Sequence, residues 1–265
     1  MSPAIASEGS GRVCVFCGKG PVTAEHVWPQ WIAKYVENAD EKIPHTAEVR
    51  HEGQEPRIEF RGIRVPFTTE AKCVCKPCNE GWMHELETSA EPILAPLIQG
   101  KSAVWHEWRQ TIAAFWAVKT AMMLEQTQKL RAIPAEIYPL FRKYQTPPPY
   151  CQVWTAAYDG DIPHNFGRGA IRMALTTPEG VAVPNEFAAY GAFVQIGALA
   201  FRIFGHLFEN GPTNVPQGEL ARALVSIRPV VPAAAWPPEM VVNDEGLELL
   251  VMSMADEDVS GPTQP

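Results

Sequence analysis

Two short stretches, Cys14-Val-Phe-Cys17 and Cys75-Lys-Pro-Cys78, each place two cysteines three positions apart. A C-x2-C pair presents two thiolates from one tight turn, and two such pairs complete a tetrahedral zinc site. Gly18 follows the first pair, where such a turn needs a residue that tolerates a positive φ. The alternative, a set of buried free cysteines, is less favoured by this paired spacing. We therefore expect a structural Zn²⁺ ion at Cys14, Cys17, Cys75 and Cys78.

The residues between and around the two pairs predict a small α+β module. Apolar periodicity and turn residues divide it into short elements. We expect strands at Arg12–Phe16, Val22–His26 and Ile58–Phe67, helices at Trp28–Val36 and Pro77–Thr88, and loops over residues 37–56. The module therefore spans residues 12–90, and residues 1–11 form a loose tail.

The rest of the chain predicts helices followed by an antiparallel sheet. Residues 102–129 form a long helix with many aromatic residues and few charges, so we expect it to be buried on most sides. After a shorter helix at Pro134–Tyr144, extended segments alternate with short turns, which favours antiparallel pairing. The expected strands are Tyr150–Tyr158, Ala170–Leu175, Tyr190–Phe204 and Leu224–Val230. A second domain therefore spans residues 91–255, and the acidic residues 256–265 form a loose tail.

Composition excludes several classes of protein. The chain has 265 residues with 46% hydrophobic content, enough for a packed core. It has no apolar run long enough to span a membrane and no signal peptide, so we expect a cytoplasmic protein. In a reducing cytosol, six cysteines at short spacings indicate metal binding more than disulfides. The net charge of −8 argues against a general binder of polyanions, and composition leaves homo-oligomerisation open.

A second group of residues lies beside the cysteine pairs. Glu25-His26-Val27-Trp28-Pro29 lies between them, and Asn79 directly follows the second pair. In this arrangement, and in the string Cys-Asn-Glu-Gly-Trp-Met at 78–83, the chain resembles the HNH (ββα-metal) endonucleases. The resemblance is to their zinc-containing branch in phage and actinobacterial proteins, and it covers roughly the first 90 residues. It implies a treble-clef-like zinc module.

The resemblance also implies roles for three of these residues. His26 would be the general base, since a neutral histidine takes a proton from water near pH 7. Glu25 and the side-chain oxygen of Asn79 would hold a catalytic Mg²⁺ or Mn²⁺, hard cations that prefer oxygen ligands. The chain departs from the family pattern in one respect. It has no convincing match for the middle asparagine that positions the histidine ring in many members, because Asn38 comes too early in the chain.

Nucleic acid, with DNA favoured over RNA, is the partner that this resemblance implies. The stretch from Arg57 to Lys76 is locally basic in an acidic chain, and phosphate contacts are expected from Arg57, Arg61, Arg64 and Lys76. The alternative is that these side chains are solvated charges at a strand edge. Trp28, Trp31 and Trp82 fit base stacking or a small core, and their helical spacing favours the core.

Three functions remain open on the sequence alone. The first is a metal-dependent HNH endonuclease that hydrolyses phosphodiester bonds. The second is a zinc-stabilised adaptor that binds nucleic acid or protein and has lost cleavage, an interpretation that the missing middle asparagine supports. The third is a nuclease effector of phage defence that a partner activates.

Overall fold

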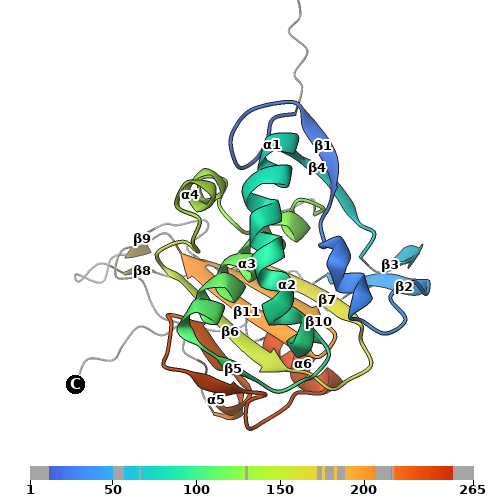
Figure 1. The fold of residues 1–265 in the computed structure, drawn as a ribbon, viewed down its shortest axis with the longest axis vertical. Helices are drawn as coiled ribbons and strands as arrows, with labels where there is room; N and C mark the ends of the chain where they lie inside the picture. The colour runs from blue at the N-terminus through green and yellow to red at the C-terminus, as the bar shows by residue number, and fades with distance from the viewer. Residues whose placement is uncertain are drawn as a thin grey trace, which may run out of the picture.

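The computed structural model describes residues 12–49, 57–65, 67–128, 131–171, 175–176, 182–183, 189–206, 216 and 218–252. It is a mixed α+β structure of helices and antiparallel sheets, as the sequence predicts (Figure 1). The two expected tails lie outside the described residues. None of the described helices has the length and apolar character needed to cross a membrane.

A five-stranded antiparallel sheet forms the centre of the molecule. Its strand order is β12-β6-β11-β10-β7, and these strands span Cys151–Ala157 (β6), His164–Ile171 (β7), Ala189–Ile196 (β10), Leu199–His206 (β11) and Val225–Arg228 (β12). The expected extended stretch over residues 190–204 is a hairpin of two strands, in which Gly197 adopts a positive φ at the turn. The predicted antiparallel sheet is therefore confirmed.

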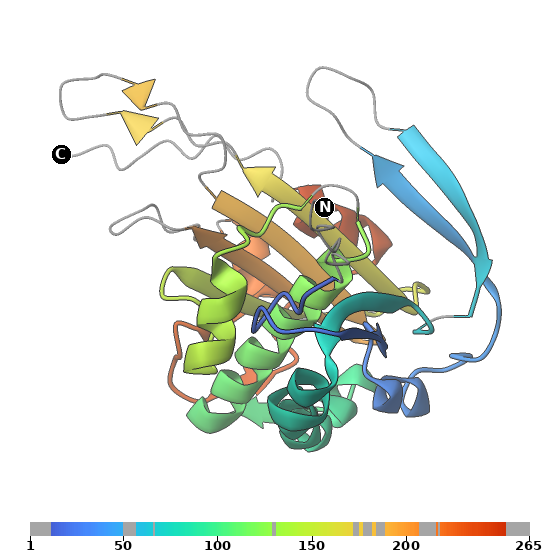
Figure 2. The ribbon, with the colours of Figure 1, turned by 90° about the horizontal axis from the view of Figure 1, so that it is seen from above.

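Both faces of this sheet are covered by helices, because alternate residues of its inner strands are apolar on both sides. Helix α3 (Glu107–Glu125) packs on one face, with α2 (His84–Ile98) beside it. Val194 and Phe201 belong to the core on that side, whereas Phe193 and Ala200 pack with α6 (Asp244–Met252) on the opposite face (Figure 2).

Helix α3 is buried from residue 113 to residue 125, which confirms the expectation from its composition. Its buried charges have partners. Lys119 Nζ lies 2.7 Å from Glu87 Oε1 of α2, and Glu125 accepts hydrogen bonds from the backbone N–H of Ile133 and the hydroxyl of Tyr138. Burial raises the pKa of that hydroxyl above its ordinary value. These bonds offset the cost of burying the charges.

The N-terminal region packs on the α2–α3 side and shares one continuous core with it. Its elements are β1 (Val22–His26), a 3-10 helix η1 (Gln30–Lys34), β2 (Ile43–Val49), β3 (Arg57–Arg64), β4 (Glu70–Cys75), α1 (Lys76–Cys78) and a π-helix η2 (Asn79–Met83) that leads into α2. Helix α2 runs through residues 90 and 91 and tolerates two internal prolines. The expected domain boundary therefore falls inside a helix.

The remaining elements lie at the periphery of the sheet. They are β5 (Ala103–Trp105), α4 (Ile137–Tyr144), β8 (Leu175–Thr176), β9 (Ala182–Val183), α5 (Glu219–Ala223) and β13 (Ala234–Trp236). Strand β5 pairs with β13, so the segment before α3 is joined to the segment that follows the central sheet. This pairing places the predicted extended segment after residue 230 in a sheet.

Four local expectations were wrong. The helix expected over residues 102–129 begins only at Glu107, because residues 103–105 form strand β5 and pair with β13. Residues 12–16 form no strand, because the turn of the first cysteine pair begins at residue 15. The expected helix over residues 28–36 is only the short 3-10 helix η1. The expected loop over residues 37–56 contains β2, whose Pro44 obscured the strand pattern, although a two-stranded hairpin tolerates a residue without an N–H donor.

Packing between α3 and the sheet gives a stability prediction. Phe201 is fully buried, and its ring centroid lies 5.8 Å from that of Trp116. We expect Phe201→Ala to lower the free energy of unfolding by about 3–5 kcal/mol, because it leaves a cavity between helix and sheet. Urea unfolding followed by circular dichroism measures this change. Leu249→Ala, at an exposed position of α6, is the matched control, and an equal effect in both variants would contradict the packing described.

Candidate metal centre and adjoining polar site

The first cysteine pair lies in a tight turn closed by backbone hydrogen bonds. The N–H of Gly18 donates to the carbonyl of Cys14 at 2.8 Å, and the N–H of Cys14 donates to the carbonyl of Lys19 at 2.9 Å. Gly18 has a φ of 70°, the left-handed region that the sequence predicts for this position. The turn therefore presents the two side chains of the pair to one point.

The second cysteine pair lies where β4 passes into helix. Cys75 ends β4, and Cys78 ends the short helix α1, in which Pro77 takes a position in the first turn. Strand β4 pairs antiparallel with β1, and Val22 faces Cys75 in the register. This ladder brings the second pair to the first, although the two pairs are far apart in sequence.

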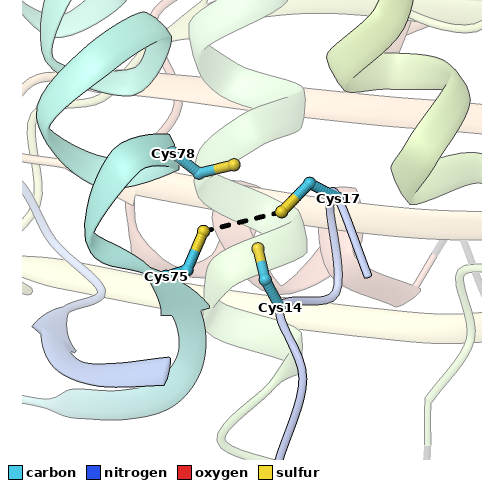
Figure 3. A group of neighbouring side chains, drawn as sticks. All are labelled: Cys14, Cys17, Cys75 and Cys78. Atoms are coloured by element: carbon cyan, nitrogen blue, oxygen red, sulfur yellow. Dashed lines mark hydrogen bonds between the residues drawn. The ribbon is translucent and has the colours of Figure 1, made fainter. Parts of the chain in front are cut away.

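The four cysteines converge on one point (Figure 3). Their sulfur atoms all lie within 4.8 Å of one another, and the sulfurs of Cys17 and Cys75 are 3.5 Å apart. A Zn–S bond of about 2.3 Å in tetrahedral geometry separates two sulfurs by roughly 3.8 Å. The predicted cluster is therefore confirmed as a group able to hold zinc, and its four-thiolate donor set fits that ion.

Burial opposes the ionisation of three of these thiols. It raises the pKa of Cys78 to about 12 and also raises that of Cys75. Burial opposes ionisation of Cys17 too, but hydrogen bonds from the Lys19 backbone and the neighbouring cysteines lower the pKa of Cys17 overall. Thiolates buried together need positive charge at their centre, which a divalent metal supplies.

Arg142 adds a contact that the sequence analysis missed. It lies on α4, well outside the expected zinc module, and its Nε donates to the sulfur of Cys78 at 3.3 Å. A zinc ion bound by four thiolates retains about two excess negative charges, which a guanidinium donor partly neutralises. Arg142 also lines an open cavity of about 490 Å³ with Pro77, Trp82, Glu85, Lys143 and Gln145. No spacing in the sequence signals this contact across 64 positions.

The other two cysteines lie outside the cluster. Cys73 and Cys151 are both buried, and burial raises the pKa of each to about 12. Among the described residues, Cys14, Cys17, Cys75 and Cys78 are the one group of three or more histidine, cysteine or acidic side chains whose ligand atoms converge. The spare thiols are therefore core residues.

Glu25 and Asn79 lie together beside the cysteine cluster. The Nδ2 of Asn79 donates to Glu25 Oε2 at 2.5 Å, and the hydroxyl of Thr23 donates to Glu25 Oε1. The register shifts opposite Thr23 and Glu25, where β4 has one residue more than β1, so β4 carries a bulge between Ala71 and Val74. Asn79 begins the π-helix η2, a rare geometry that is frequent at functional sites. Two of the three residues expected to be catalytic are therefore in direct contact.

His26 ends β1, and its imidazole has two polar neighbours. Its Nδ1 lies 3.3 Å from Gln30 Nε2, and its Nε2 lies 4.0 Å from the carboxylate of Glu70, the residue that faces His26 across the β1–β4 ladder. The sequence analysis missed both neighbours. The i, i+4 spacing of His26 and Gln30 was the available signal, but the expected helix began after His26.

The four cations expected to bind nucleic acid lie in two places. Arg57, Arg61 and Arg64 are exposed on β3. Arg57 and Arg61 pair with Glu59, and Arg61 also donates to Gln128 at 3.4 Å. Lys76 is exposed on α1, 3.3 Å from Glu80. These cations therefore do not form one cluster.

The three tryptophans near the cluster pack in the core. Trp28, Trp31 and Trp82 are all buried, and Trp28 contacts the ring of His164 on β7 edge to face.

No protein-family model, curated protein or solved structure matches the chain. The chemistry of the site is therefore inferred from its own geometry.

The cluster predicts the metal content of the protein. We expect the chain, purified under reducing conditions, to contain equimolar zinc by inductively coupled plasma mass spectrometry, because four converging thiolates are a closed structural site. Cys78→Ser should lose the metal, and Cys73→Ser should retain it, since Cys73 lies outside the cluster. Metal-free wild type, or equal loss of zinc in the two variants, would contradict the assignment.

The contact from α4 gives a second prediction. Arg142→Met removes the guanidinium that donates to Cys78, so transfer of zinc to a chromogenic chelator should become about tenfold faster. Lys143→Met is the control, because it removes a neighbouring positive charge that also lines the cavity. Equal release rates for the two variants would show that Arg142 has no specific role.

Proposed function

We propose that the chain is a metal-dependent endonuclease that hydrolyses phosphodiester bonds of nucleic acid. The observation that carries the proposal is the contact between Glu25 and Asn79, which lie 54 positions apart and meet beside the cysteine cluster with His26 adjacent. Oxygen donors from two elements next to a histidine supply the parts that metal-assisted hydrolysis needs. This combination supports the resemblance to HNH endonucleases.

Glu25 and Asn79 have the donor atoms that a hard divalent cation prefers. A carboxylate and an amide oxygen are typical ligands of Mg²⁺ and Mn²⁺, and two protein ligands leave room for water and phosphate. A cation bound there would stabilise the charge that develops on the phosphate and on the departing oxygen. Thr23, which also donates to Glu25, would hold the carboxylate in place. The amide nitrogen of Asn79 faces Glu25. For Asn79 to bind the cation, its amide must rotate so that the oxygen points toward the metal.

His26 would act as the general base. In this scheme Nε2 takes a proton from water while the water oxygen bonds to phosphorus and the bond from phosphorus to the 3′ oxygen breaks. The oxygen and the nitrogen of a glutamine amide are isosteric, so the Gln30 amide can also lie with its Oε1 toward His26 Nδ1. In that orientation Nδ1–H of His26 donates to Oε1, and Nε2 of His26 is unprotonated and able to take the proton. Glu70 would then stabilise the imidazolium that forms. Gln30 would therefore take the role of the missing middle asparagine.

A second candidate function is a zinc-stabilised adaptor that binds without cutting. The observation that favours it is the hydrogen bonding of Glu25, whose two carboxylate oxygens both accept from protein donors. A carboxylate satisfied in this way has less need of a cation. A nuclease that a partner activates would combine the two functions: it would not cut before activation, and the metal would enter the site only after activation.

Plasmid cleavage tests the proposal. We expect the wild type with Mn²⁺ to nick or linearise supercoiled plasmid, and His26→Ala to reduce the rate at least about 100-fold because the general base is removed. Glu25→Gln and Asn79→Ala should each raise the Mn²⁺ concentration required. The rates are measured by agarose gel electrophoresis, with zinc content checked in every variant.

The control is His84→Ala, an exposed histidine at the start of α2. It should cut at the wild-type rate. Cleavage that survives in His26→Ala would refute the assigned base. A wild type that binds DNA or RNA yet cuts neither would establish the adaptor, and cleavage that appears only with an added partner would establish the activated nuclease.

A further inference from the structure

The β1–β4 ladder has two faces that carry different parts of the polar site. Directly opposite residues of an antiparallel pair lie on the same face, and so do alternate residues of one strand. Glu25 faces Ala71 in the register, and His26 faces Glu70. Glu25 therefore lies on the face that contacts Asn79, whereas His26 and Glu70 lie together on the other face.

Lys72 lies on the same face as His26 and Glu70. It follows Glu70 by two positions in β4, and both are exposed, whereas Ala71 between them is buried. Lys72 is therefore the diagonal neighbour of His26, at a spacing of about 7–8 Å that a long side chain can cross. The residue of β1 next to His26 on this face is Ala24, whose exposed side chain is a single methyl group. No large side chain of β1 therefore separates Lys72 from His26.

Lys72 is also the only lysine or arginine in the two strands of the ladder. The cations nearest to it on other elements already have partners, since Lys76 pairs with Glu80 and Arg142 donates to Cys78. Within the described part of the chain, no carboxylate forms an ion pair with the ammonium of Lys72. Its charge is therefore available to a ligand.

A phosphodiester that reaches His26 meets negative charge on this face. In the proposed reaction the attacking water bonds to His26 Nε2, so the scissile phosphate lies close to that nitrogen. The carboxylate of Glu70 is 4.0 Å from the same nitrogen, and the chain has a net charge of −8, so both repel the phosphate. A cation at Glu25 and Asn79 would compensate on the opposite face of β1. An ammonium beside His26 supplies the compensating charge on this one.

We propose that Lys72 is a substrate-binding residue, whose ammonium contacts a non-bridging oxygen of the phosphate presented to His26. This inference rests on the proposed nuclease function and deepens it. The contact offsets the repulsion by Glu70, which leaves that carboxylate free to stabilise the imidazolium. Because the contact is to the phosphate backbone, it holds the nucleic acid without reading its base sequence.

Duplex binding by the full chain tests the contact. Fluorescence anisotropy is measured with a labelled DNA duplex and no added Mg²⁺ or Mn²⁺, so that the probe stays intact. We expect Lys72→Met to weaken binding about tenfold, because one charge-assisted hydrogen bond is lost, and Lys72→Arg to stay within about twofold of the wild type. Lys72→Met should also reduce the logarithmic slope of affinity against salt by about 0.9, the contribution of one neutralised phosphate.

Cleavage kinetics separate binding from chemistry. With Mn²⁺ and plasmid, Lys72→Met should raise KM about tenfold and leave kcat within about threefold of the wild type, because the contact is made before the reaction as well as during it. The matched control is Lys101→Met, which removes the same charge at an exposed lysine beyond α2 that contacts Gln99. This control should retain the wild-type affinity and KM.

Zinc content and urea unfolding confirm that each variant folds. Wild-type duplex affinity in Lys72→Met would overturn the proposal, and so would an equal loss in Lys101→Met, which would show an effect of net charge alone. A loss in Lys72→Arg as large as that in Lys72→Met would also overturn it, since arginine retains the charge that the phosphate needs.

The two proposals fail in different ways. If the wild type cuts plasmid and Lys72→Met retains both duplex affinity and KM, the Lys72 contact is refuted and the nuclease stands. If the wild type cuts nothing with Mg²⁺ or Mn²⁺ but binds duplex DNA through Lys72, the nuclease is refuted and the contact stands as part of an adaptor. A wild type that neither cuts nor binds nucleic acid would refute both.

Discussion

The convergence of four sulfur atoms is the constraint on which the N-terminal architecture depends. Cys17 and Cys75 lie 58 positions apart, and their sulfur atoms are 3.5 Å apart. Closing the loop between them costs chain entropy, which the contacts around the cysteines must offset. The β1–β4 ladder follows from this closure, since β1 lies a few residues after Cys17 and β4 ends at Cys75. Asn79 directly follows Cys78, so the same closure also brings its amide to Glu25. A metal that ties the sulfurs together therefore organises the polar site as well.

The cluster is not an independent unit, because the rest of the chain contributes to its surroundings. Arg142 of α4 contacts Cys78, and the ring of Phe16, inside the first pair, packs against Trp82 and Tyr138. One continuous core runs from Cys14 to Trp236. Loss of a metal bound by the four cysteines would therefore disturb the packing of α4 as well as the turns that hold the cysteines, which is the usual coupling between metal binding and folding.

Sequence reasoning succeeded where a pattern has one structural solution. The two C-x2-C pairs, the apolar stretch that forms α3 and the alternating strands of the sheet were all predictable, because each depends on local periodicity or spacing. It failed where the contact is made between distant elements. Arg142 and Glu70 have no sequence signal that links them to Cys78 and His26. Pro44 concealed β2, since a proline argues against a central strand but is tolerated in a two-stranded hairpin.

The position of the β2–β3 hairpin explains how one compact site can adjoin an extended arm. His26 and Glu70 form the last pair of the β1–β4 ladder, so the chain leaves the ladder after one and returns to it at the other. Everything inserted between them is held at both ends by the ladder and, beyond it, by the cysteine cluster. The register shift near Gly62 affects only β2 and β3, which leaves the geometry of Glu25, His26 and Asn79 unaffected. The insertion can therefore change in length and surface while the polar site keeps its form, so contact with a substrate and the proposed chemistry would be separable properties of this chain.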